Sequence, residues 1–367
     1  MAAKVYFVDM RANVKQNLLD KLLKLWEKTG FNNLITEKDL VAFKVHFGEK
    51  GNLAYIRPQY LRQLVDKVKE LGGNPFLTDA NTLYVGSRAN AVDHIITAIE
   101  NGWPYSVVGA PVIIADGLTG KDYINVPIEG KHFNEVKIGS AAIHADAFIS
   151  VSHFKGHGLT GFGATIKNIG MGLGSRSGKQ MMHSDVLPNV DSEKCVGCTR
   201  CAKWCPGEAI EIVERKANII KAQCIGCGEC TVTCPEGAIA VNWKTEPHLI
   251  QEKMAEYTMG VLKNKKDKCG FITFITQVSP ECDCCGWNDA PIVRDIGIVA
   301  SMDPIALDQA AIDLVNQEQV LPGSKLEGKE EAKDKIKALH PESDYDKSLV
   351  HGEELGLGTR KYELIKL

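Results

Sequence analysis

Two cysteine-rich segments constrain this 367-residue chain more than any other feature. The segment CVGCTRCAKWCP begins at Cys195, and the segment CIGCGECTVTCP begins at Cys224. Each has the spacing C-x2-C-x2-C-x3-C, and a proline follows its fourth cysteine. Cysteines clustered at metal-ligand spacing indicate a metal or cluster centre in a reducing compartment, whereas disulfide cysteines typify secreted chains. We therefore expect a cytoplasmic protein whose thiolates hold metal.

The spacing resembles the duplicated pattern of bacterial ferredoxins, in which three cysteines of one run and the fourth of the other bind each [4Fe–4S] cluster. The resemblance implies two [4Fe–4S] clusters with crossed ligation. The first cluster takes Cys195, Cys198, Cys201 and Cys234, and the second takes Cys224, Cys227, Cys230 and Cys205. Zinc also binds four thiolates, but three-plus-one spacing with a following proline is not a zinc-ribbon pattern.

The cysteine runs define a module over residues 190–242, and residues 1–189 and 243–367 form the rest of the chain. A short apolar segment follows each run, at residues 208–214 and 237–243, and predicts a strand. No segment resembles a linker long enough to split the remaining residues. We therefore expect an α+β ferredoxin-like module inserted into one body domain. Electron transfer is the leading hypothesis for the function of this module.

The body alternates strand-like and helix-like segments. Apolar runs predict strands at residues 5–9, 41–47, 75–79, 111–116, 147–153, 271–277 and 295–301. Helical periodicity and capping residues predict helices at residues 14–29, from Pro58 to Gly72, from Ser87 to Gly102, and after Asp303. The alternation predicts an α/β fold with a mostly parallel sheet and helices on both faces. The charged residues 324–347 are expected to form a solvated helix and loop.

Polar residues end several of the predicted strands. They are Asp9, His46, Asp79, Asp116, His153, Ser301 and Asp303. Ligands of open α/β sheets bind in the crevice outside the carboxyl ends of the strands. We expect several of these residues to share one cleft, although any one of them can equally cap a helix or make a turn.

Residues 153–179, HFKGHGLTGFGATIKNIGMGLGSRSGK, are rich in glycine, histidine and lysine. They are not a phosphate loop, because the glycine spacing is one residue too long and Gln180 replaces the Ser or Thr that binds Mg²⁺. We expect a flexible loop whose backbone N–H groups and lysines hold an anion. The candidate catalytic residues are His153, Lys155, His157 and Lys167 of this segment, together with Asp79. Each histidine is either a ligand or a structural hydrogen-bonding residue.

Four cysteines lie outside the duplicated motifs, namely Cys269, Cys282, Cys284 and Cys285. Four is the number that a further zinc or Fe–S site uses. Adjacent Cys284 and Cys285 do not easily bind one ion together. The expected third metal site is therefore Cys282 with one of these two, completed by Cys269 or a histidine of residues 153–157. A redox dithiol and unliganded reduced thiols stay open as alternatives.

Motifs across nearly the whole chain resemble the uncharacterised Fe–S centre protein family, domain of unknown function 362. They include FKVHFGEKG, FLTDANTLYVGSRANAVDH, SHFKGHGLTGFGATIKNIGMG, CDCCGWNDAPIVRDIGIVASMDPIALDQA, HGEELGLG and both cysteine runs. The resemblance implies a body domain with a [4Fe–4S] ferredoxin insert and no settled reaction. The family's motif positions fall here on His46, Asp79, Arg88, His153, Lys155, His157, Lys167, Asn168, Cys282 and Cys284.

These features together favour an iron–sulfur redox protein that relays electrons from a partner protein, through two clusters, to a substrate or metal site in the body. The substrate would be a small anion, and the enzyme class would be a ferredoxin-linked oxidoreductase. An electron-carrier subunit without an active site and a metal or cluster delivery protein that uses Cys282 to Cys285 stay open. The net charge of −3 gives no general attraction to nucleic acid, and no apolar run approaches a membrane span.

Overall fold

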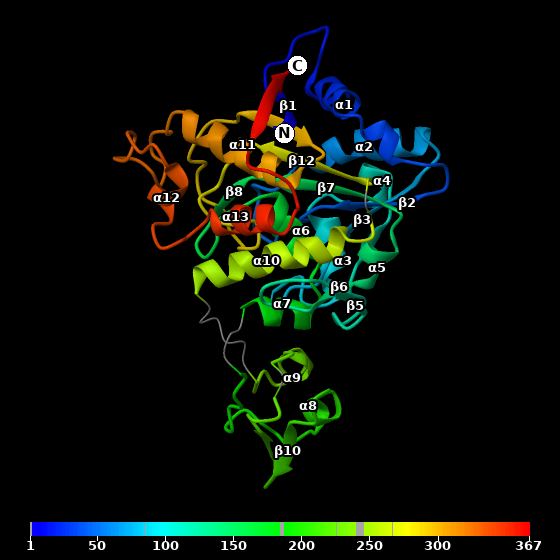
Figure 1. The fold of residues 1–367 in the computed structure, drawn as a ribbon, viewed down its shortest axis with the longest axis vertical. Coiled ribbons are helices and arrows are strands. Elements are labelled where there is room, and N and C mark those ends of the chain that lie inside the picture. The colour runs from blue at the N-terminus through cyan, green and yellow to red at the C-terminus, as the bar shows by residue number, and fades with distance from the viewer. Residues whose placement is uncertain (1, 85, 184–186, 225, 240–245, 266) are drawn as a thin grey trace.

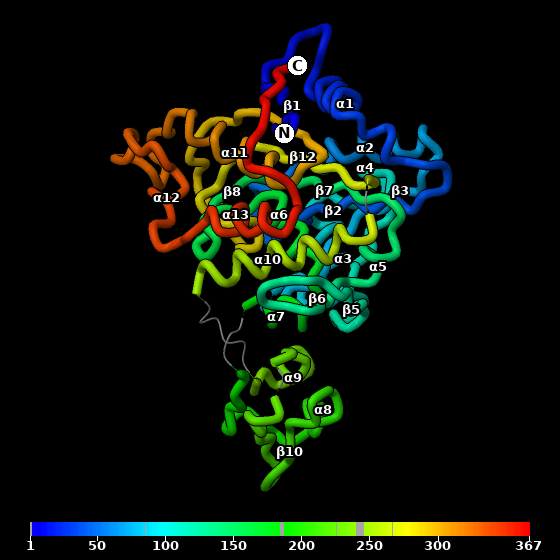
Figure 2. The backbone as a smooth tube through the Cα atoms, viewed as in Figure 1, coloured from blue at the N-terminus to red at the C-terminus, as the bar shows by residue number. Residues whose placement is uncertain are grey.

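The computed structural model describes residues 2–367 apart from 85, 184–186, 225, 240–245 and 266. Figure 1 shows a large α/β body with a smaller unit, formed by the cysteine-rich residues, at one end. The backbone trace in Figure 2 places both chain ends on the side of the body away from this unit. The first and last strands pair there, because Ala3 lies opposite Tyr362.

An eight-stranded sheet forms the centre of the body. In spatial order its strands are β14 (Tyr362–Lys366), β1 (Ala3–Asp9), β13 (Gly297–Ser301), β12 (Cys269–Ile275), β7 (Ala147–His153), β2 (Leu40–Lys44), β3 (Asn74–Asp79) and β4 (Val112–Ile114). Five of the seven pairings are parallel, and the two that β13 makes are antiparallel. The prediction of a mostly parallel sheet is confirmed.

Helices cover both faces of the sheet, as predicted. One face packs on α1 (Leu18–Thr29), η1 (Phe31–Leu34), α2 (Pro58–Glu70), α3 (Ala91–Glu100) and α4 (Tyr105–Val108), and the other on α6 (Thr165–Leu173), α10 (Pro247–Leu262), α11 (Pro304–Gln317) and α13 (Lys347–Glu354). Successive residues of β7 point to opposite faces. Accordingly Phe148 belongs to one hydrophobic core and Ile149 to the other.

The remaining body elements are short. They are β5 (Tyr123–Pro127), β6 (Glu135–Gly139), α5 (Ser140–His144), β8 (Lys155–His157), β9 (Gly161–Gly163), α7 (Arg176–His183) and α12 (Lys335–Leu339). The charged residues 324–347 form α12 and its flanking loops, and Ile336 of α12 is buried. Among the described residues, none of the helices has the length and apolar character needed to cross a membrane.

Two predicted helix starts are wrong, and side-chain capping explains both. Helix α1 begins at Leu18 because Asn17 accepts the free N–H groups of its first turn, and Val14 is fully exposed outside it. Helix α3 is capped by Asn90, while Ser87 donates its hydroxyl to Glu49 instead. Three apolar side chains of α3, those of Val92, Ile96 and Ile99, are about half exposed.

The glycine-rich residues 153–179 do not form the flexible loop that we expected. They fold into the hairpin of β8 and β9, followed by α6 and the first half of α7. Several glycines serve close packing here: a Cβ on Gly170 would lie 2.2 Å from the backbone oxygen of Met254 on α10. The glycines therefore let helices approach each other and do not make the segment irregular.

The cysteine-rich residues form a small unit with its own hydrophobic cluster. It contains α8 (Arg200–Lys203), β10 (Ile210–Val213), β11 (Lys216–Ile219) and α9 (Glu229–Thr233). The strand predicted at 208–214 is β10, which pairs with β11. The strand predicted at 237–243 lies largely outside the described residues, and its Ile239 makes an isolated bridge to Val190.

Candidate functional site

A cavity of about 270 Å³ lies in the body beyond the carboxyl ends of β2 and β3. Its cationic lining residues are Lys44, Arg88, Lys155, Lys167 and Lys179. Asp79 is the one carboxylate among the described residues that line it. Apolar side chains, including Met171 and Ile250, complete the wall. Such an excess of positive charge around one cavity favours an anionic ligand.

A buried ion pair forms the floor of the cavity. Lys44, the last residue of β2, places its Nζ 3.0 Å from Asp79 Oδ1 and donates to Asn168 Oδ1 at 2.8 Å. Burial lowers the pKa of Lys44 to about 8. Burial works against the charge of Asp79 as well, but Lys44 and His94 hold the pKa of this carboxyl well below its usual range. The floor therefore carries a fixed carboxylate that pairs with Lys44 and, at 3.4 Å, with Arg88.

His153 supports the cavity from behind and does not line it. Its Nδ1 donates to Asp283 at 2.9 Å, and its Nε2 donates to the backbone oxygen of Thr276 at 2.7 Å. Both partners only accept, so neither ring nitrogen is free to bind metal or substrate. Asp283 also pairs with Lys155 at 3.0 Å, which fixes that lysine at the cavity wall. Of the candidate catalytic residues, the other four (Asp79, Lys155, His157 and Lys167) line the cavity.

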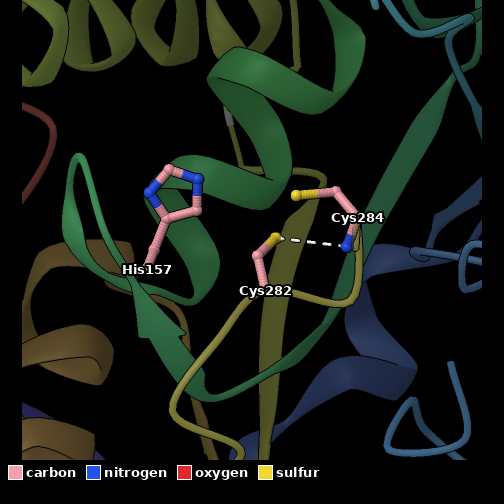
Figure 3. Close-up of side chains that lie close together, drawn as sticks. All are labelled: His157, Cys282 and Cys284. Atoms are coloured by element: carbon pink, nitrogen blue, oxygen red, sulfur yellow. Dashed lines mark hydrogen bonds between the residues drawn. The ribbon is translucent and has the colours of Figure 1, made fainter. Parts of the chain in front are cut away.

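Two cysteines and a histidine meet at one wall of this cavity. The donor atoms of His157, Cys282 and Cys284 all lie within 4.8 Å of one another (Figure 3). Lys167 on α6 places its Nζ 3.3 Å from Cys282 Sγ. Burial opposes the charge of Lys167, but the neighbouring thiols of Cys282 and Cys284 raise its pKa above the usual value. Among the described residues, this is the group suited to hold a single metal ion.

The other two cysteines outside the repeats, Cys269 and Cys285, do not belong to this group. Cys269 begins β12, whereas Cys282 and Cys284 follow the opposite end of that strand, so the structure does not bring Cys269 to the group. Cys285 lies beside Cys284, whose thiol lowers the pKa of Cys285, but it is not one of the three clustered donors. Of the combinations expected for a third site, the structure assembles Cys282 and Cys284 with a histidine.

The loop that carries these sulfurs is held on the body by residues that the sequence did not single out. The N–H of Glu49 donates to the backbone oxygen of Asp283 at 2.9 Å. The side chain of Asn52 donates to the backbone oxygens of Cys285 at 3.2 Å and Trp287 at 2.9 Å. A Cβ on Gly51 would lie 2.4 Å from the backbone oxygen of Gly286, so the two loops touch. The sulfur loop is therefore positioned by backbone contacts.

Several cavity residues went unnoticed in the sequence. Lys44, Tyr84 and Glu49 all line it or contact its cations. For Lys44 a signal existed, because a lysine inside the apolar strand VAFKVHF cannot be buried without a partner. Tyr84 and Glu49 gave no such signal, since both lie in loops and meet Arg88 only in the folded chain.

Not every polar strand end reaches the cavity. Asp9 is exposed and pairs with Lys21. Asp116 accepts hydrogen bonds from the backbone and side chain of Asn81 and so shapes a turn. Strand β13 runs antiparallel to its neighbours, so Ser301 ends at the opposite edge of the sheet. Asp303 caps α11 there.

In the cysteine-rich unit, cysteines from both runs come together. A small cavity is lined by Cys195, Cys198, Cys201 and Cys234. The last of these belongs to the second run. The remaining cysteines also interact: burial and the thiols of Cys227 and Cys224 raise the pKa of Cys230 to about 12, and burial with a smaller contribution from Cys205 raises that of Cys227. The small cavity thus brings together the four cysteines expected for the first cluster, and the crossed ligation of two clusters stays a prediction.

The cysteine-rich unit contacts the body through a buried ion pair. Glu229 on α9 accepts from Lys137 Nζ at 3.1 Å and from the Tyr123 hydroxyl at 2.9 Å. Lys121 donates to the Thr233 hydroxyl at 2.7 Å. Figure 1 shows α9 next to α7, with α8 and β10 farther from the body. The second cysteine run is thus the part of the unit nearest the body.

Comparison with known proteins gives one family and remote likenesses to solved structures. The family profile described as domain of unknown function (DUF362) matches residues 41–313. No curated protein matches the chain. The lactate racemase apoprotein from Thermoanaerobacterium thermosaccharolyticum is similar at 10% identity and a TM-score of 0.35, over 74% of this chain and 50% of that one. A Thermotoga maritima protein is similar at 10% identity and a TM-score of 0.35, over 76% and 54%. The chain spans about half the length of these structures.

Proposed function

The chain belongs to the DUF362 family of unknown function, and we propose that it is an iron–sulfur redox protein that passes electrons to a small anion bound in the body cavity. The observation that carries this proposal is the position of α7. This helix lines the cavity with Lys179 and contacts the cysteine-rich unit with Gln180. One helix therefore separates the second cysteine run from the ligand space.

The contact between α7 and the second run is close because of a glycine. Gly228, between Cys227 and Cys230, has φ +72°, and a Cβ there would lie 2.2 Å from Cγ of Gln180. Gln180 is itself buried. A side chain at residue 228 would push the run away from α7, so the glycine keeps the sulfurs of Cys227 and Cys230 near the cavity wall.

The cysteine-rich unit supplies the donors that two [4Fe–4S] clusters need. The spacing of each run and the meeting of Cys234 with the first run favour clusters over zinc. Each cluster, when bound, accepts and gives up one electron. Helix α8, which carries Cys201 of the first set, lies farther from the body than α9 in Figure 1, and Cys198 is exposed. We infer that a redox partner docks near this end and that electrons leave from the end beside α7.

The cavity is suited to an anion because its lysines retain unused donors. Within the described residues, Lys155 bonds to Asp283, Lys167 to Cys282, and Lys179 to the backbone oxygen of Gly174. An ammonium group has three N–H donors, so each of these lysines can also donate to a carboxylate or phosphate oxygen. Burial lowers the pKa of Lys179 to about 8, so its ammonium group can supply a proton near neutral pH.

The two alternatives fit the cavity less well. A plain electron carrier gains nothing from five cationic side chains around one cavity, because burying charge costs free energy. Metal delivery is favoured by the group of His157, Cys282 and Cys284. Cys282, however, is only 2% exposed and accepts from Lys167, which suits a retained metal more than a transferred one.

Anion binding followed by reoxidation tests the proposed function. The chain is purified without oxygen, photoreduced with deazaflavin, and mixed with inorganic phosphate, small dicarboxylates, 2-oxo acids and enoates. We expect saturable binding of at least one class and reoxidation of the reduced clusters by a member of it. Lys155→Met should weaken binding about 10- to 100-fold, since a hydrogen bond to a charged group contributes about 1.5–3 kcal/mol. The exposed Lys28→Met is the control.

The outcome is decided by two comparisons. Binding lost in Lys155→Met and kept in Lys28→Met supports an anion site in the cavity. Equal binding by both variants, or stable reduced clusters in the presence of every bound anion, contradicts the proposal.

A further inference from the structure

We propose that His157, Cys282 and Cys284 bind one divalent metal ion of the zinc class, with a free coordination position that opens into the cavity. The site belongs to the body and does not depend on clusters in the cysteine-rich unit. It assigns a role to the ECDCC segment, residues 281–285, which the electron route leaves unused.

The spacing of the three donors suits a tetrahedral ion. Zinc–sulfur and zinc–nitrogen bonds of about 2.3 and 2.0 Å place tetrahedral ligand atoms about 3.5–3.8 Å apart. The donors of His157, Cys282 and Cys284 already lie within 4.8 Å of one another. Small side-chain rotations that move each donor atom by a fraction of an ångström therefore bring the three donors to tetrahedral spacing. The backbone does not need to move.

Backbone contacts hold the two cysteines in place before any metal binds. Between them, Asp283 is fully buried and anchored by His153 and Lys155. The N–H of Cys284 donates to Cys282 Sγ at 3.4 Å, which turns both sulfurs to the same side (Figure 3). A loop fixed in this way loses little conformational entropy when it binds an ion.

The imidazole of His157 is also fixed. Its Nδ1 accepts the backbone N–H groups of Leu159 at 3.2 Å and Thr160 at 3.1 Å. In Figure 3 the other nitrogen edge of the ring faces the two sulfurs. Nε2 is therefore the ligand atom, and a metal ion takes the place of the proton that the neutral ring carries there. The donors to Nδ1 set the ring orientation, as neighbours of metal-bound histidines commonly do.

The free position follows from which residues line the cavity. His157 and Cys284 line it, whereas Cys282 lies behind them against Lys167. Three protein ligands with one open position are the arrangement of catalytic zinc, including sites with two cysteines and one histidine. Thiolate and imidazole donors favour zinc and neighbouring transition metals over Mg²⁺ or Ca²⁺. The ammonium of Lys167 offsets the charge of the second thiolate.

The position of the metal site also narrows the class of ligand that the cavity can bind. An ion at the wall can bind one oxygen of a small anion while Lys155 and Lys179 receive a second anionic group across the cavity. The ligand class is therefore a small molecule with two oxygen-bearing groups, such as a hydroxy or oxo acid. Its metal-bound oxygen would be polarised, which is the contribution of a Lewis acid.

Cobalt uptake tests the site, because Co²⁺ bound by thiolates gives intense sulfur-to-metal charge-transfer absorption. The full chain, treated with a chelator, is titrated with Co²⁺ and then Zn²⁺, and metal and acid-labile sulfide are measured per chain. We expect one Co²⁺ per chain beyond any cluster iron, displaced by Zn²⁺. The double variant Cys282→Ser and Cys284→Ser should lose the absorption, and Lys167→Met should weaken affinity about 10-fold or more. Cys269→Ser is the matched control, since it changes a cysteine at the far end of β12.

Each result is decisive. Loss of the charge-transfer band in the double variant and in His157→Gln, with a circular dichroism spectrum unchanged from Cys269→Ser, supports the site. A wild-type chain that takes up no Co²⁺, or a double variant that takes up as much Co²⁺ per chain as the wild type at equal sulfide content, overturns it, because thiols of the cysteine-rich unit bind Co²⁺ in both when their clusters are absent. Reversible loss of two thiols upon oxidation without any metal uptake identifies a dithiol instead. Acid-labile sulfide is measured separately, so a chain that lacks clusters does not count against the metal site.

Discussion

Single residues decide what the cavity can hold, because buried charges there are matched by few opposite ones. Lys44 is satisfied by Asp79 and Asn168, whereas Lys167 and Lys179 have no carboxylate within hydrogen-bond distance among the described residues. Glycines make room for these long side chains. A Cβ on Gly163 would lie 3.2–3.3 Å from carbons of Lys167 and Lys155. The glycines of residues 153–179 thus leave space for the lysines that give the cavity its positive charge.

Gly172→Ala tests this use of glycine. Its Cβ would lie 2.5 Å from Cε and 2.7 Å from Nζ of Lys44, a side chain held by three hydrogen-bonding partners. Overpacking of this kind costs about 1–3 kcal/mol, so urea denaturation should show lower stability by that amount. Gly158→Ala, which meets nothing within 4 Å, should change stability by less than about 0.5 kcal/mol. Equal stability of the two variants would show that the Lys44 side chain moves aside at little cost in free energy.

At the scale of elements, one histidine ties three segments together. His351 on α13 contacts Glu256 of α10 at 3.1 Å and Glu354 at 3.0 Å. Glu256 also accepts backbone N–H groups of residues 131–133. The pair of His132 and Glu252 lies alongside. The carboxylates favour the charged imidazole, so the hydrogen bond to Glu256 is the main cause of a raised pKa of His351.

The raised pKa of His351 predicts a pH dependence of stability. Because the folded pKa lies above the unfolded value of about 6.5, the contribution of this histidine is complete below pH 6.5 and is lost as pH rises through the folded pKa. His351→Gln should therefore lower the free energy of unfolding at pH 6 more than at pH 9, as measured by urea denaturation. His144→Gln, at an exposed position, is the control. A His351→Gln effect of the same size at both pH values would contradict the argument.

The sequence predicts strands of this fold better than its helix boundaries or its cavity. The strands at 75–79 and 147–153 are confirmed because apolar runs buried on both faces leave little choice of conformation. Predictions of helix starts fail where two capping residues compete, as Ser87 and Asn90 do. A tertiary contact between Ser87 and Glu49 decides which of the two caps α3. Asp79 could be placed at a strand end, but the meeting of His157 with Cys282 depends on loops 125 residues apart in sequence.

At the scale of the whole molecule, the orientation of the cysteine-rich unit matters most. Its described contacts with the body include those of α9 and Gly228, which bring the second cysteine run to α7, and the Trp204 ring, which lies 3.7 Å from Lys121 Nζ. The pair of Glu229 and Lys137 is almost fully buried, at 5% and 7% exposure. Removal of one partner from a buried pair leaves an uncompensated charge. Docking of the unit should therefore depend on this pair.

Glu229→Gln tests the docking. The change leaves Lys137 without its carboxylate, and breaking a buried pair costs about 3–5 kcal/mol. Amide hydrogens of α7 and α9 should then exchange faster in native-state hydrogen exchange, while those of β7 stay protected. Glu193→Gln, an exposed acid of the same unit, should leave exchange unchanged. Unchanged exchange at α7 and α9 in Glu229→Gln would mean that the ion pair does not hold the unit.

The ligation pattern makes a further prediction for the whole molecule. Cys234 is the fourth cysteine of the second run but shares a cavity with Cys195, Cys198 and Cys201. Cys234→Ser should therefore damage the cluster of the first run and spare the other. Electron paramagnetic resonance of the reduced variant, compared with Cys205→Ser, distinguishes the two. Damage confined to the cluster of Cys224 and its neighbours would show that ligation is not crossed.

The most direct measurement is the iron, zinc and acid-labile sulfide content of the chain purified without oxygen. The electron route requires two [4Fe–4S] clusters, so the account predicts about eight irons and about eight sulfides per chain. Zinc in place of iron, with no sulfide, would contradict the central claim, since zinc has no redox chemistry to pass electrons to the cavity.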